Sequence, residues 1–600
     1  MIEKFRRRAD RVLLAAGVLC AATIVMWPVL KSPFCGDDAL DSLHPMRLKY
    51  SGQSVWSLIW EITNSWRSAQ GRFFPGAVSL GVFVHQIFPD LGPYKVVQLF
   101  VVLVGLALFV YVVQLLTRSF RAAVVAGLLV VSALQFRVQY DPILQFSIQQ
   151  PTLMILLLAT TAFLINGVRR DATWMLVIAG LFYSCALLTY ETTLLLVPMF
   201  VVMLWVEKPK GFLIRSLSVV IPAFAAGVNL AYLRASTTTT AAGYTSDLSL
   251  SKVVPTFLRQ SVGALPFSYA QINTPPFIQR FPHFLDIRTA RTWLLVILVV
   301  ALLGAALRGL PRVPPKNLLV LAFSGLSLWL IPALVVSQTV RWQSEVVWGN
   351  AYIPVYVEYF GFSLVGLSVI LSMRLILLKL KTPIRIVFGA ALVILVTAGS
   401  VAASSNNRLA VQQYNPGYLW SRQFFERSIS RGVFEGLENG DSVFTPGGQL
   451  WFEPAFVAWW KGPRLASIVD SIEDPQYMSC VTDTATCVDH FDGAFLQFGI
   501  FPTEIRATIV GNQFELASDG SKFTSLRVAD PRIYVELLRS FDSIQVRENR
   551  CRSWAVSRYQ AQGLTIPVES IDVVSSAENW CILDVRASES IDALKFTAHP

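Results

Sequence analysis

Two adjacent carboxylates, Asp37 and Asp38, follow the first long apolar run of the chain, within the segment PFCGDDALDSLHP. Like charges this close raise each other's pKa unless a cation, a metal ion or a hydrogen-bonded ligand compensates them. Their chemistry would be proton abstraction from a hydroxyl or ligation of a divalent cation such as Mg²⁺ or Mn²⁺. Gly36 lets the backbone turn tightly before them. A solvated loop, or a cap on a following helix, accounts equally well for the pair taken alone.

An arginine framed by aromatic residues is the second candidate. The segment WRSAQGRFFPG places Arg72 directly after Gly71, and Trp56, Trp60 and Trp66 precede it. This pattern predicts a Trp-anchored helix on the bilayer surface, followed by a return of the chain that presents Arg72. A guanidinium binds phosphate through its bidentate fork. Snorkelling to the lipid headgroups is the commoner use of such an arginine.

Polar residues at three further ends of apolar runs complete the candidate set. These residues are Tyr140, Asp141, Tyr190, Glu191, Arg341 and Tyr352. Glu191 lies in a connection almost too short to leave the membrane, and an acid in that position is by default a functional candidate. Headgroup anchoring of the tyrosines and local pairing of Arg341 with Glu345 are the structural alternatives.

The elements that must position these residues are membrane spans. Of 600 residues, 54% are hydrophobic and only 15% are charged, with a mean hydropathy of +0.52, which excludes a soluble enzyme with one anchor. The first apolar run is expected to be a permanent span, because no small-residue cleavage site follows it. About eleven spans are expected from apolar length. They cover residues 12–30, 96–116, 122–136, 151–168, 173–190, 193–206, 214–232, 292–307, 318–336, 355–373 and 384–403.

We attribute the net charge of +11 to the membrane topology and not to binding of a nucleic acid. Basic clusters fall in alternate short connections, so the N-terminus is expected to be cytoplasmic. Residues 1–403 then form a transmembrane domain in contact with the bilayer, and residues 404–600 lie outside. These features favour a bacterial inner membrane with a periplasmic or otherwise extracytoplasmic C-terminal domain.

The C-terminal domain, 404–600, has the composition of a soluble α/β or β-rich module. Short alternating runs are separated by turn residues, and RIYVELLRS is expected to form a helix. Cys480 with Cys487, and Cys551 with Cys581, are expected to form disulfides in an oxidising compartment. A zinc site is disfavoured, because neither pair has ligand spacing or neighbouring histidines.

Carboxylates, arginines and aromatic residues at one membrane surface suit a transferase with a lipid-linked donor. A carboxylate would deprotonate an acceptor hydroxyl, cations would hold the departing lipid phosphate, and aromatic or amide groups would hold a sugar. No nucleotide-binding loop is present in the sequence, and such a donor needs none.

The chain resembles the GT-C superfamily of multi-pass membrane glycosyltransferases. The resemblance rests on Gly36-Asp37-Asp38 after the first span, on the Gly71-Arg72-Phe73-Phe74 segment and the Tyr190-Glu191 turn, and on a soluble domain behind the last span. It implies a GT-C-like fold, a polyprenyl-phosphate-linked sugar as donor, inversion at the anomeric carbon, and Asp37 or Asp38 as general base or ligand of a divalent cation. By location, Arg72 and Arg341 are the phosphate candidates. The sugar or acceptor candidates are Tyr140, Asp141, Tyr190, Glu191 and Tyr352.

Two other functions stay open at this stage. A glycan polymerase or ligase would consume polyprenyl-diphosphate oligosaccharides with similar arginines. A transporter or flippase would show internal repeats and charges near the membrane midplane, whereas the charges here cluster at the span ends. The WWD-type acceptor motif of oligosaccharyltransferases is missing, which argues against protein N-glycosylation.

Overall fold

The computed structural model describes residues 2–137, 140–207, 211–236, 245–268, 288–377 and 382–414, and ten strands between residues 442 and 598. The chain divides into two compact units. One comprises residues 1–48 and 52–414, and the other comprises residues 49–51 and 415–600. The first unit is helical and the second is built on a β-sheet.

Eight helices in the described part of the chain are long and apolar enough to cross a membrane. Uncharged runs fold this way because a helix satisfies all its backbone hydrogen bonds internally. The eight are α1 (Ile2–Met26), which continues into η1 (Trp27–Lys31), α6 (Leu91–Thr117), α8 (Gln149–Arg169), α11 (Phe212–Ser236), α14 (Ala290–Arg308), α15 (Pro315–Ser337), α17 (Val355–Leu377) and α18 (Thr382–Tyr414). The protein is therefore a polytopic helical membrane protein, as the sequence predicts.

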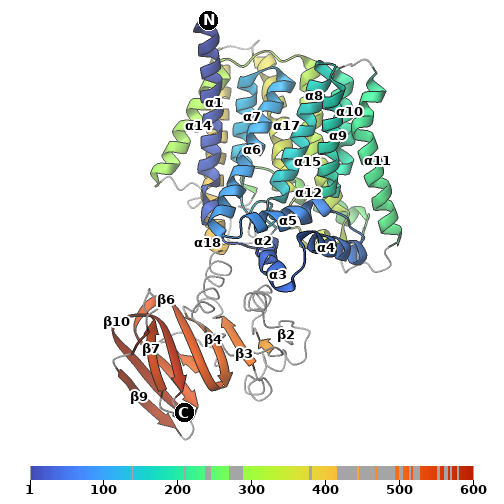
Figure 1. Ribbon diagram of the computed structural model, residues 1–600. Helices are drawn as coiled ribbons and strands as arrows, with labels where there is room; N and C mark the ends of the chain where they lie inside the picture. Colours follow the sequence, from blue (N-terminus) through green and yellow to red (C-terminus); the bar gives the residue numbers. More distant parts are fainter. Residues whose placement is uncertain are drawn as a thin grey trace. The chain divides into compact units, whose positions relative to one another are not determined.

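The other three expected spans are shorter helices. Residues 122–136, 173–190 and 193–206 correspond to α7 (Phe120–Ala133), α9 (Thr173–Thr189) and η2 (Glu191–Leu196) with α10 (Val197–Glu207). Every residue of α7 from Ala122 to Ala133 is buried, because α1, α6, α14, α17 and α18 pack around it. Its apolar sequence is that of a central helix enclosed by the others (Figure 1).

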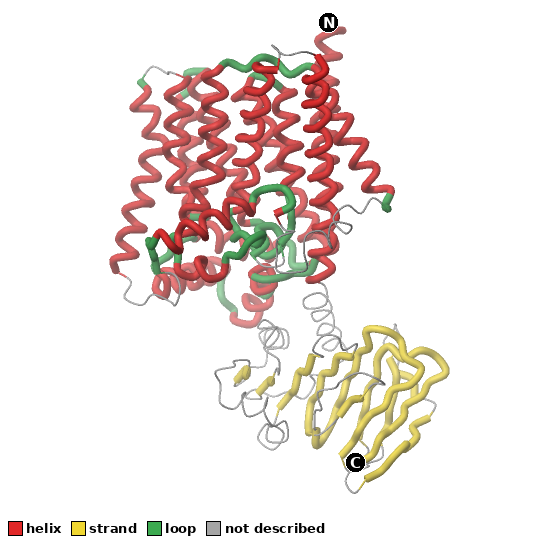
Figure 2. The backbone as a smooth tube through the Cα atoms, turned by 180° about the vertical axis from the view of Figure 1, so that it is seen from behind, coloured by secondary structure: helices red, strands yellow, loops and turns green. Residues whose placement is uncertain are grey.

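Short helices gather at the end of the bundle opposite the N-terminus, which we call the site end (Figures 1 and 2). They are α2 (Asp37–Asp41), α3 (His44–Ser51), α4 (Val55–Gln70), α5 (Pro75–Ile87) and α12 (Leu250–Gly263). The expected amphipathic helix is α4: Leu58 and Ile59 pack against Leu48 and Val82, while Trp56 and Trp60 are 69% and 59% exposed.

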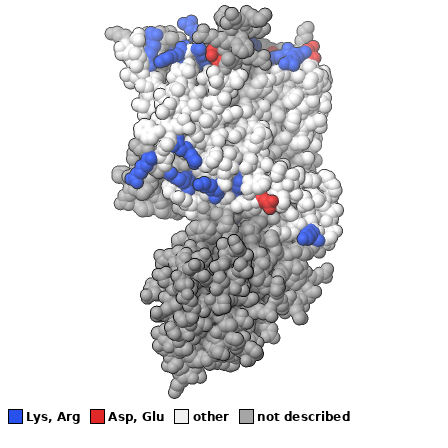
Figure 3. All heavy atoms as spheres, turned by 60° about the vertical axis from the view of Figure 1, so that its left-hand side comes forward, with Lys and Arg blue, Asp and Glu red and all other residues white. Residues whose placement is uncertain are grey.

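Charged side chains lie at the two ends of the helical unit. On the face drawn in Figure 3, lysines and arginines border a broad band of uncharged residues. A band free of charge is what the hydrocarbon of a bilayer requires.

The second unit holds one ten-stranded sheet of order β2-β1-β3-β4-β6-β10-β7-β8, with β5 beside β6 and β9 beside β10. Its strands are β1 (Ser442–Phe444), β2 (Ser467–Val469), β3 (Gly493–Phe498), β4 (Ile505–Asn512), β5 (Glu515–Ala517), β6 (Val528–Asn549), β7 (Trp554–Tyr559), β8 (Thr565–Pro567), β9 (Ser570–Ala577) and β10 (Trp580–Ala598). β1 runs parallel to β2 and β3, and the remaining pairs are antiparallel.

The helix expected at RIYVELLRS is wrong in this structure, because the segment lies within β6. Residues 532–536 pair with β4 on one side and β10 on the other. Strand pairing on both sides satisfies the backbone and overrides helix propensity, which is a weak preference.

The expected disulfides lie outside the described residues. Cys480, Cys487 and Cys551 fall between described strands, and only the backbone of Cys581 is described, in β10. Both disulfides therefore stay predictions.

Candidate functional site

The acidic pair opens α2, and a glycine fixes its direction. Gly36 has a φ of 58°, and a Cβ added there would lie 2.9 Å from the Cβ of Gln145. Any other residue would be strained and crowded at this position. The chain turns at Gly36 so that the amide of Asp38 donates to the carbonyl of Gln145, at 3.0 Å.

Asp38 is a buried structural anchor. Its Oδ1 accepts hydrogen bonds from the Tyr94 hydroxyl (2.5 Å) and the Ser147 amide (2.6 Å). Its Oδ2 accepts from Lys95 Nζ and Gln98 Nε2, both at 3.4 Å. Burial raises the pKa of Asp38, and Lys95 and Tyr94 oppose that rise. The side chain has no exposed surface, and its hydrogen bonds tie α2 to α6.

Asp37 has the opposite surroundings. Its side chain is exposed, and no hydrogen bond or ion pair reaches its carboxylate from the residues that the structure describes. Limited access of solvent around the carboxylate raises the pKa of Asp37 to about 7, with Asp41 and Asp38 adding to the rise and the Arg341 charge opposing it. A carboxylate of this pKa accepts a proton near neutral pH, as a general base must.

A third acid, Asp41, completes this acidic cluster. Its Oδ1 lies 3.1 Å from His44 Nε2, and its Oδ2 accepts a hydrogen bond from the Ser147 hydroxyl at 2.5 Å. His85 Nε2 lies 3.4 Å from the same hydroxyl. Burial favours a higher pKa for Asp41, but the His44 hydrogen bond and the nearby histidine charges lower the pKa overall. Asp41 thus stays ionised beside Asp37.

Arg72 and Glu191 form an ion pair across 119 positions, with Nε to Oε1 at 2.6 Å. Arg72 follows α4 at its left-handed glycine cap, Gly71, and Glu191 opens η2. The Arg72 guanidinium lies 4.8 Å from the ring of Phe74 and 6.0 Å from that of Tyr190. Burial alone would raise the pKa of Glu191, but Arg72 lowers it below its usual range.

A second cluster surrounds Arg341, on the short helix α16 (Val340–Glu345). Arg341 Nε lies 2.9 Å from Glu345 Oε1. This is the local ion pair that the sequence predicts as the structural alternative to a binding role for Arg341. The Tyr140 hydroxyl donates to the other oxygen of Glu345. The rings of Trp342 and Tyr352 stack at 3.6 Å, and the Tyr140 ring lies edge-on to both, at 5.4 and 5.6 Å.

Gln260 of α12 holds the backbone of Tyr352. Its Oε1 accepts from the Tyr352 amide at 2.8 Å, and its Nε2 donates to the Tyr352 carbonyl at 3.2 Å. The same Nε2 donates to Glu358 Oε1 at 2.9 Å. This clamp fixes the position from which the Tyr352 ring enters the aromatic cluster.

Backbone strain concentrates in the segment that joins these groups. Tyr140, Ser147 and Ile148 have φ values of 54°, 20° and 55°, where residues other than glycine are uncommon. Such conformations persist only where the surroundings impose them, and they gather at functional sites.

Asp141 serves this same segment rather than an open site. Its two oxygens accept backbone hydrogen bonds from Arg137, Ile143 and Leu144, at 2.6 to 2.8 Å. Burial raises the pKa of Asp141 to about 6, against the effect of these hydrogen bonds. Its carboxylate is fully buried, so the structure separates it from the exposed Asp37.

Electrostatic contacts connect the clusters. The Arg341 charge acts on Asp37, and Tyr352 and Tyr190 act on Arg72. Some charges of the predicted residues Asp37, Arg72, Tyr190, Arg341 and Tyr352 therefore act on one another across the clusters.

The sequence does not predict several residues that the structure places at the site. Lys95, fully buried in α6, had a signal, because a charge within an apolar span is costly and usually functional. Ser147 and Gln260 gave no such signal, since their partners Asp38 and Tyr352 lie 109 and 92 positions away in the chain.

The divalent cation expected from the sequence stays a prediction. No group of three or more His, Cys, Asp or Glu side chains in the described part of the chain is placed to hold a metal ion. Asp38, one of the expected ligands, has both oxygens occupied by protein hydrogen bonds.

No protein-family model and no curated protein matches the chain. Among solved structures, it is similar to arabinosyltransferase EmbB from Mycobacterium smegmatis, with 11% identity and a TM-score of 0.28. The match covers 99% of this chain and 63% of EmbB, so the chain spans less than two thirds of that protein's length. A TM-score this low identifies neither a donor, an acceptor nor a catalytic residue.

Proposed function

We propose that the protein is a membrane glycosyltransferase that moves a sugar from a polyprenyl-phosphate donor to a hydroxyl of an extracytoplasmic glycan or lipid acceptor. The observation that carries the proposal is the exposed residue Asp37 at the site end, whose carboxyl has a pKa of about 7 that the charge of Arg341 opposes. Proton acceptor and cation are the two groups that glycosyl transfer from a phosphate requires.

Asp37 rather than Asp38 is the proposed base. Four hydrogen-bond donors from the protein occupy the oxygens of Asp38. Moving Asp38 to meet a substrate would leave Lys95 and Gln98 buried without their partner, which is costly. Asp37 needs no such rearrangement, because no hydrogen bond or ion pair from the residues that the structure describes holds its carboxylate.

The proposed reaction is one displacement at the anomeric carbon. The acceptor hydroxyl gives its proton to Asp37 while its oxygen forms a bond to the anomeric carbon. The bond from that carbon to the phosphate oxygen breaks, and the oxygen keeps the electron pair. The sugar is inverted, and the lipid leaves as a phosphate monoester with one more negative charge, which Arg341 would stabilise.

The aromatic cluster is the proposed sugar subsite. The ring centroids of Tyr140, Trp342 and Tyr352 lie within 6 Å of one another, beside the cation proposed for the phosphate, with Trp342 and Tyr352 largely buried. Tyr352 stacks on Trp342 and is held from behind by Gln260, so its position is rigid. Rigid aromatic surfaces bind an apolar sugar face with little loss of conformational entropy.

The proposed setting is the bacterial inner membrane, with a cytoplasmic N-terminus and the site end facing outward. Basic residues in the connections at the opposite end support this orientation. The C-terminal unit would then be extracytoplasmic, where we propose that it holds the acceptor.

The test is transfer of radiolabelled sugar from a panel of polyprenyl-phosphate sugars by the full-length protein in lipid nanodiscs. Asp37→Asn should abolish transfer without lowering the melting temperature. Asp90→Asn is the matched control, because Asp90 is an exposed aspartate at the start of α6. Undiminished transfer by Asp37→Asn would remove Asp37 from the mechanism. No transfer from any monosaccharide donor would overturn the proposed function.

A further inference from the structure

Three arginines lie at the end of the bundle opposite the site end, which we call the N-terminal end (Figure 1). They are Arg121 in the first turn of α7, Arg312 in the connection between α14 and α15, and Arg374 in the last turn of α17. We name these three residues the arginine cluster. None of their guanidinium groups forms a hydrogen bond or an ion pair with a residue that the structure describes.

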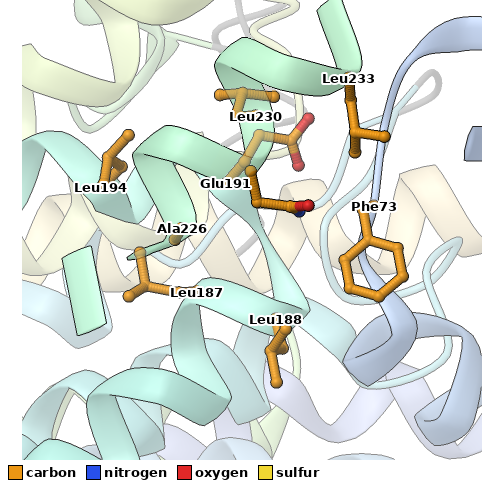
Figure 4. Close-up of a pocket in the computed structure, with 9 residues that line it drawn as sticks. Phe73, Leu187, Leu188, Glu191, Leu194, Ala226, Leu230 and Leu233 are labelled. Atoms are coloured by element: carbon orange, nitrogen blue, oxygen red, sulfur yellow. The ribbon is translucent and has the colours of Figure 1, made fainter. Parts of the chain in front are cut away.

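Several other arginines at the two ends of the bundle have a carboxylate as partner. At the site end, Arg72 pairs with Glu191, which lines the small pocket drawn in Figure 4. At the N-terminal end, Arg215 pairs with Asp171. These arginines are compensated within the chain, whereas the described residues leave the arginine cluster without a counter-ion.

Packing brings the members of the arginine cluster together. The guanidinium of Arg121 lies against Gly309, where an added Cβ would overlap its Nη1 atom. Gly309 begins the connection that carries Arg312, and the charge of Arg312 acts on Arg374. The helix α7 packs against both α14 and α17. One connection therefore contacts the first guanidinium, carries the second and lies within electrostatic reach of the third.

The elements that carry the arginine cluster supply no carboxylate. The sequence holds no Asp or Glu at residues 91–140, 287–344 or 359–425. These runs include α7, α14, α15 and all of α17 beyond its first turn. The other acids described at the N-terminal end are Asp10, which makes no ion pair, and Asp171 and Glu207, which pair with Arg215 and Arg169.

An anion would remove two costs at this place. Guanidinium groups of like charge repel each other. The Nη1 atom of Arg374 is buried and has no hydrogen-bond partner among the described residues, and an unsatisfied buried donor is unfavourable. The last turn of a helix favours a cation, but that accounts for Arg374 alone. A phosphate offers several acceptor oxygens together with the missing negative charge.

The surroundings favour a phosphate that belongs to a lipid. The arginine cluster lies at helix ends, and charged residues border the broad uncharged band of the helical unit (Figure 3). Two apolar side chains on the same helices face outward, because Leu319 of α15 is 58% exposed and Ile376 of α17 is 56% exposed. Cations at the edge of an apolar surface match the headgroup and the chains of an anionic phospholipid.

We propose that the arginine cluster binds the phosphate of an anionic phospholipid, whose acyl chains contact Leu319 and Ile376. This site is separate from the proposed sugar transfer, because it lies at the other end of the bundle and shares no residue with the site end. The inference stands or fails independently of the proposed function.

The test measures binding of phosphatidylglycerol to the full-length protein, purified in detergent and stripped of lipid. Native mass spectrometry gives the Kd, and phosphatidylcholine with the same acyl chains is the reference lipid. We expect phosphatidylglycerol to bind at least tenfold more tightly, because each arginine at a membrane surface contributes about a fivefold factor. Phosphatidylglycerol should also raise the melting temperature, since it binds the folded protein.

Three variants separate the arginine cluster from net charge. Arg312→Gln should weaken binding of phosphatidylglycerol about fivefold. Arg215→Gln is the matched control: it removes the same charge from the same end, but from an arginine that already has Asp171 as partner, so binding should be unchanged. Gly309→Ala keeps every charge and displaces Arg121, and it should weaken binding as Arg121→Gln does.

The melting temperature without lipid distinguishes a binding site from a structural one. Arg312→Gln should not lower it, because the substitution relieves repulsion and breaks no contact with a described residue. A clear loss of stability there would overturn the assignment, as would equal binding of the two lipids or an equal effect of Arg312→Gln and Arg215→Gln. Displacement of the lipid by inorganic phosphate at the same concentration would show that the site takes a free anion and not a lipid.

Discussion

The guanidinium of Arg72 lies 2.6 Å from the carboxylate of Glu191, and each group is largely buried, at 11% and 21% exposure. Arg72 follows the site-end helix α4, whereas Glu191 begins η2 within the bundle. The pair therefore joins two elements that are distant in sequence. Removing one partner leaves the other charge partly desolvated and uncompensated.

Arg72→Gln is expected to destabilise the protein by about 2 kcal/mol, because Glu191 then keeps a buried charge without its cation. The double variant Arg72→Gln with Glu191→Gln should recover part of that loss, since the two amides can hydrogen-bond to each other. Thermal unfolding of the wild type, both single variants and the double variant measures the coupling. Additive effects of the two substitutions would contradict a functioning ion pair.

Asp38→Asn is expected to lower the melting temperature much more than Asp37→Asn. The introduced amide nitrogen is a donor, and it would face the donors Lys95 and Gln98, whereas the carboxylate oxygen accepted hydrogen bonds from both. Leaving these buried groups unsatisfied costs about 2 kcal/mol. Comparison of the melting temperatures at pH 7 tests this. Equal stability of the two variants would show that Asp38 is not the anchor that its hydrogen bonds indicate.

Sugar transfer is expected to rise with pH and to reach half its maximum near pH 7, because Asp37 must be deprotonated to act as a base and its pKa is about 7. Arg341→Gln should move the midpoint of kcat/KM to higher pH, since the Arg341 charge lowers that pKa. Arg47→Gln, which breaks an exposed pair with Glu61, is the control and should not move it. A midpoint near pH 4 would rule out Asp37 as the titrating group.

The same raised pKa predicts a stability effect. Ionising Asp37 is harder in the folded protein than in the unfolded chain, so the contribution of Asp37 to stability is greatest below pH 4 and declines as pH rises toward 7. Asp37→Asn removes this decline. The variant should be more stable than the wild type at pH 8, by about 1 kcal/mol after allowance for solvent screening of an exposed group. Unfolding by denaturant at pH 5 and pH 8 measures the change, and a gain that is the same at both values would contradict it.

Trp342→Ala is expected to raise the KM for the donor about tenfold, because it removes the ring that stacks on Tyr352. Tyr140→Phe keeps the ring and loses only the hydrogen bond to Glu345, so its effect should be threefold or less. Trp56→Ala, at an exposed position of α4, is the matched control. A Trp342→Ala variant with unchanged KM and lower kcat would remove the aromatic cluster from donor binding.

The sequence by itself determined the membrane architecture. Runs without charge must form helices in a bilayer, and this local property identified the apolar segments that became α1, α6, α8, α11, α14, α15, α17 and α18. It also placed Asp37 and Glu191 at the ends of apolar runs, where charges are tolerated, and Arg72 after a predicted surface helix.

Only the tertiary structure decided what these residues do. Asp37 and Asp38 are identical in type and adjacent in sequence, yet one is exposed and the other is enclosed by Tyr94, Lys95 and Ser147. Those partners lie more than fifty positions away, and no local pattern encodes which of two neighbouring side chains they will surround. Burial, pairing and pKa arise from contacts between distant segments, so they exist only once the helices have packed.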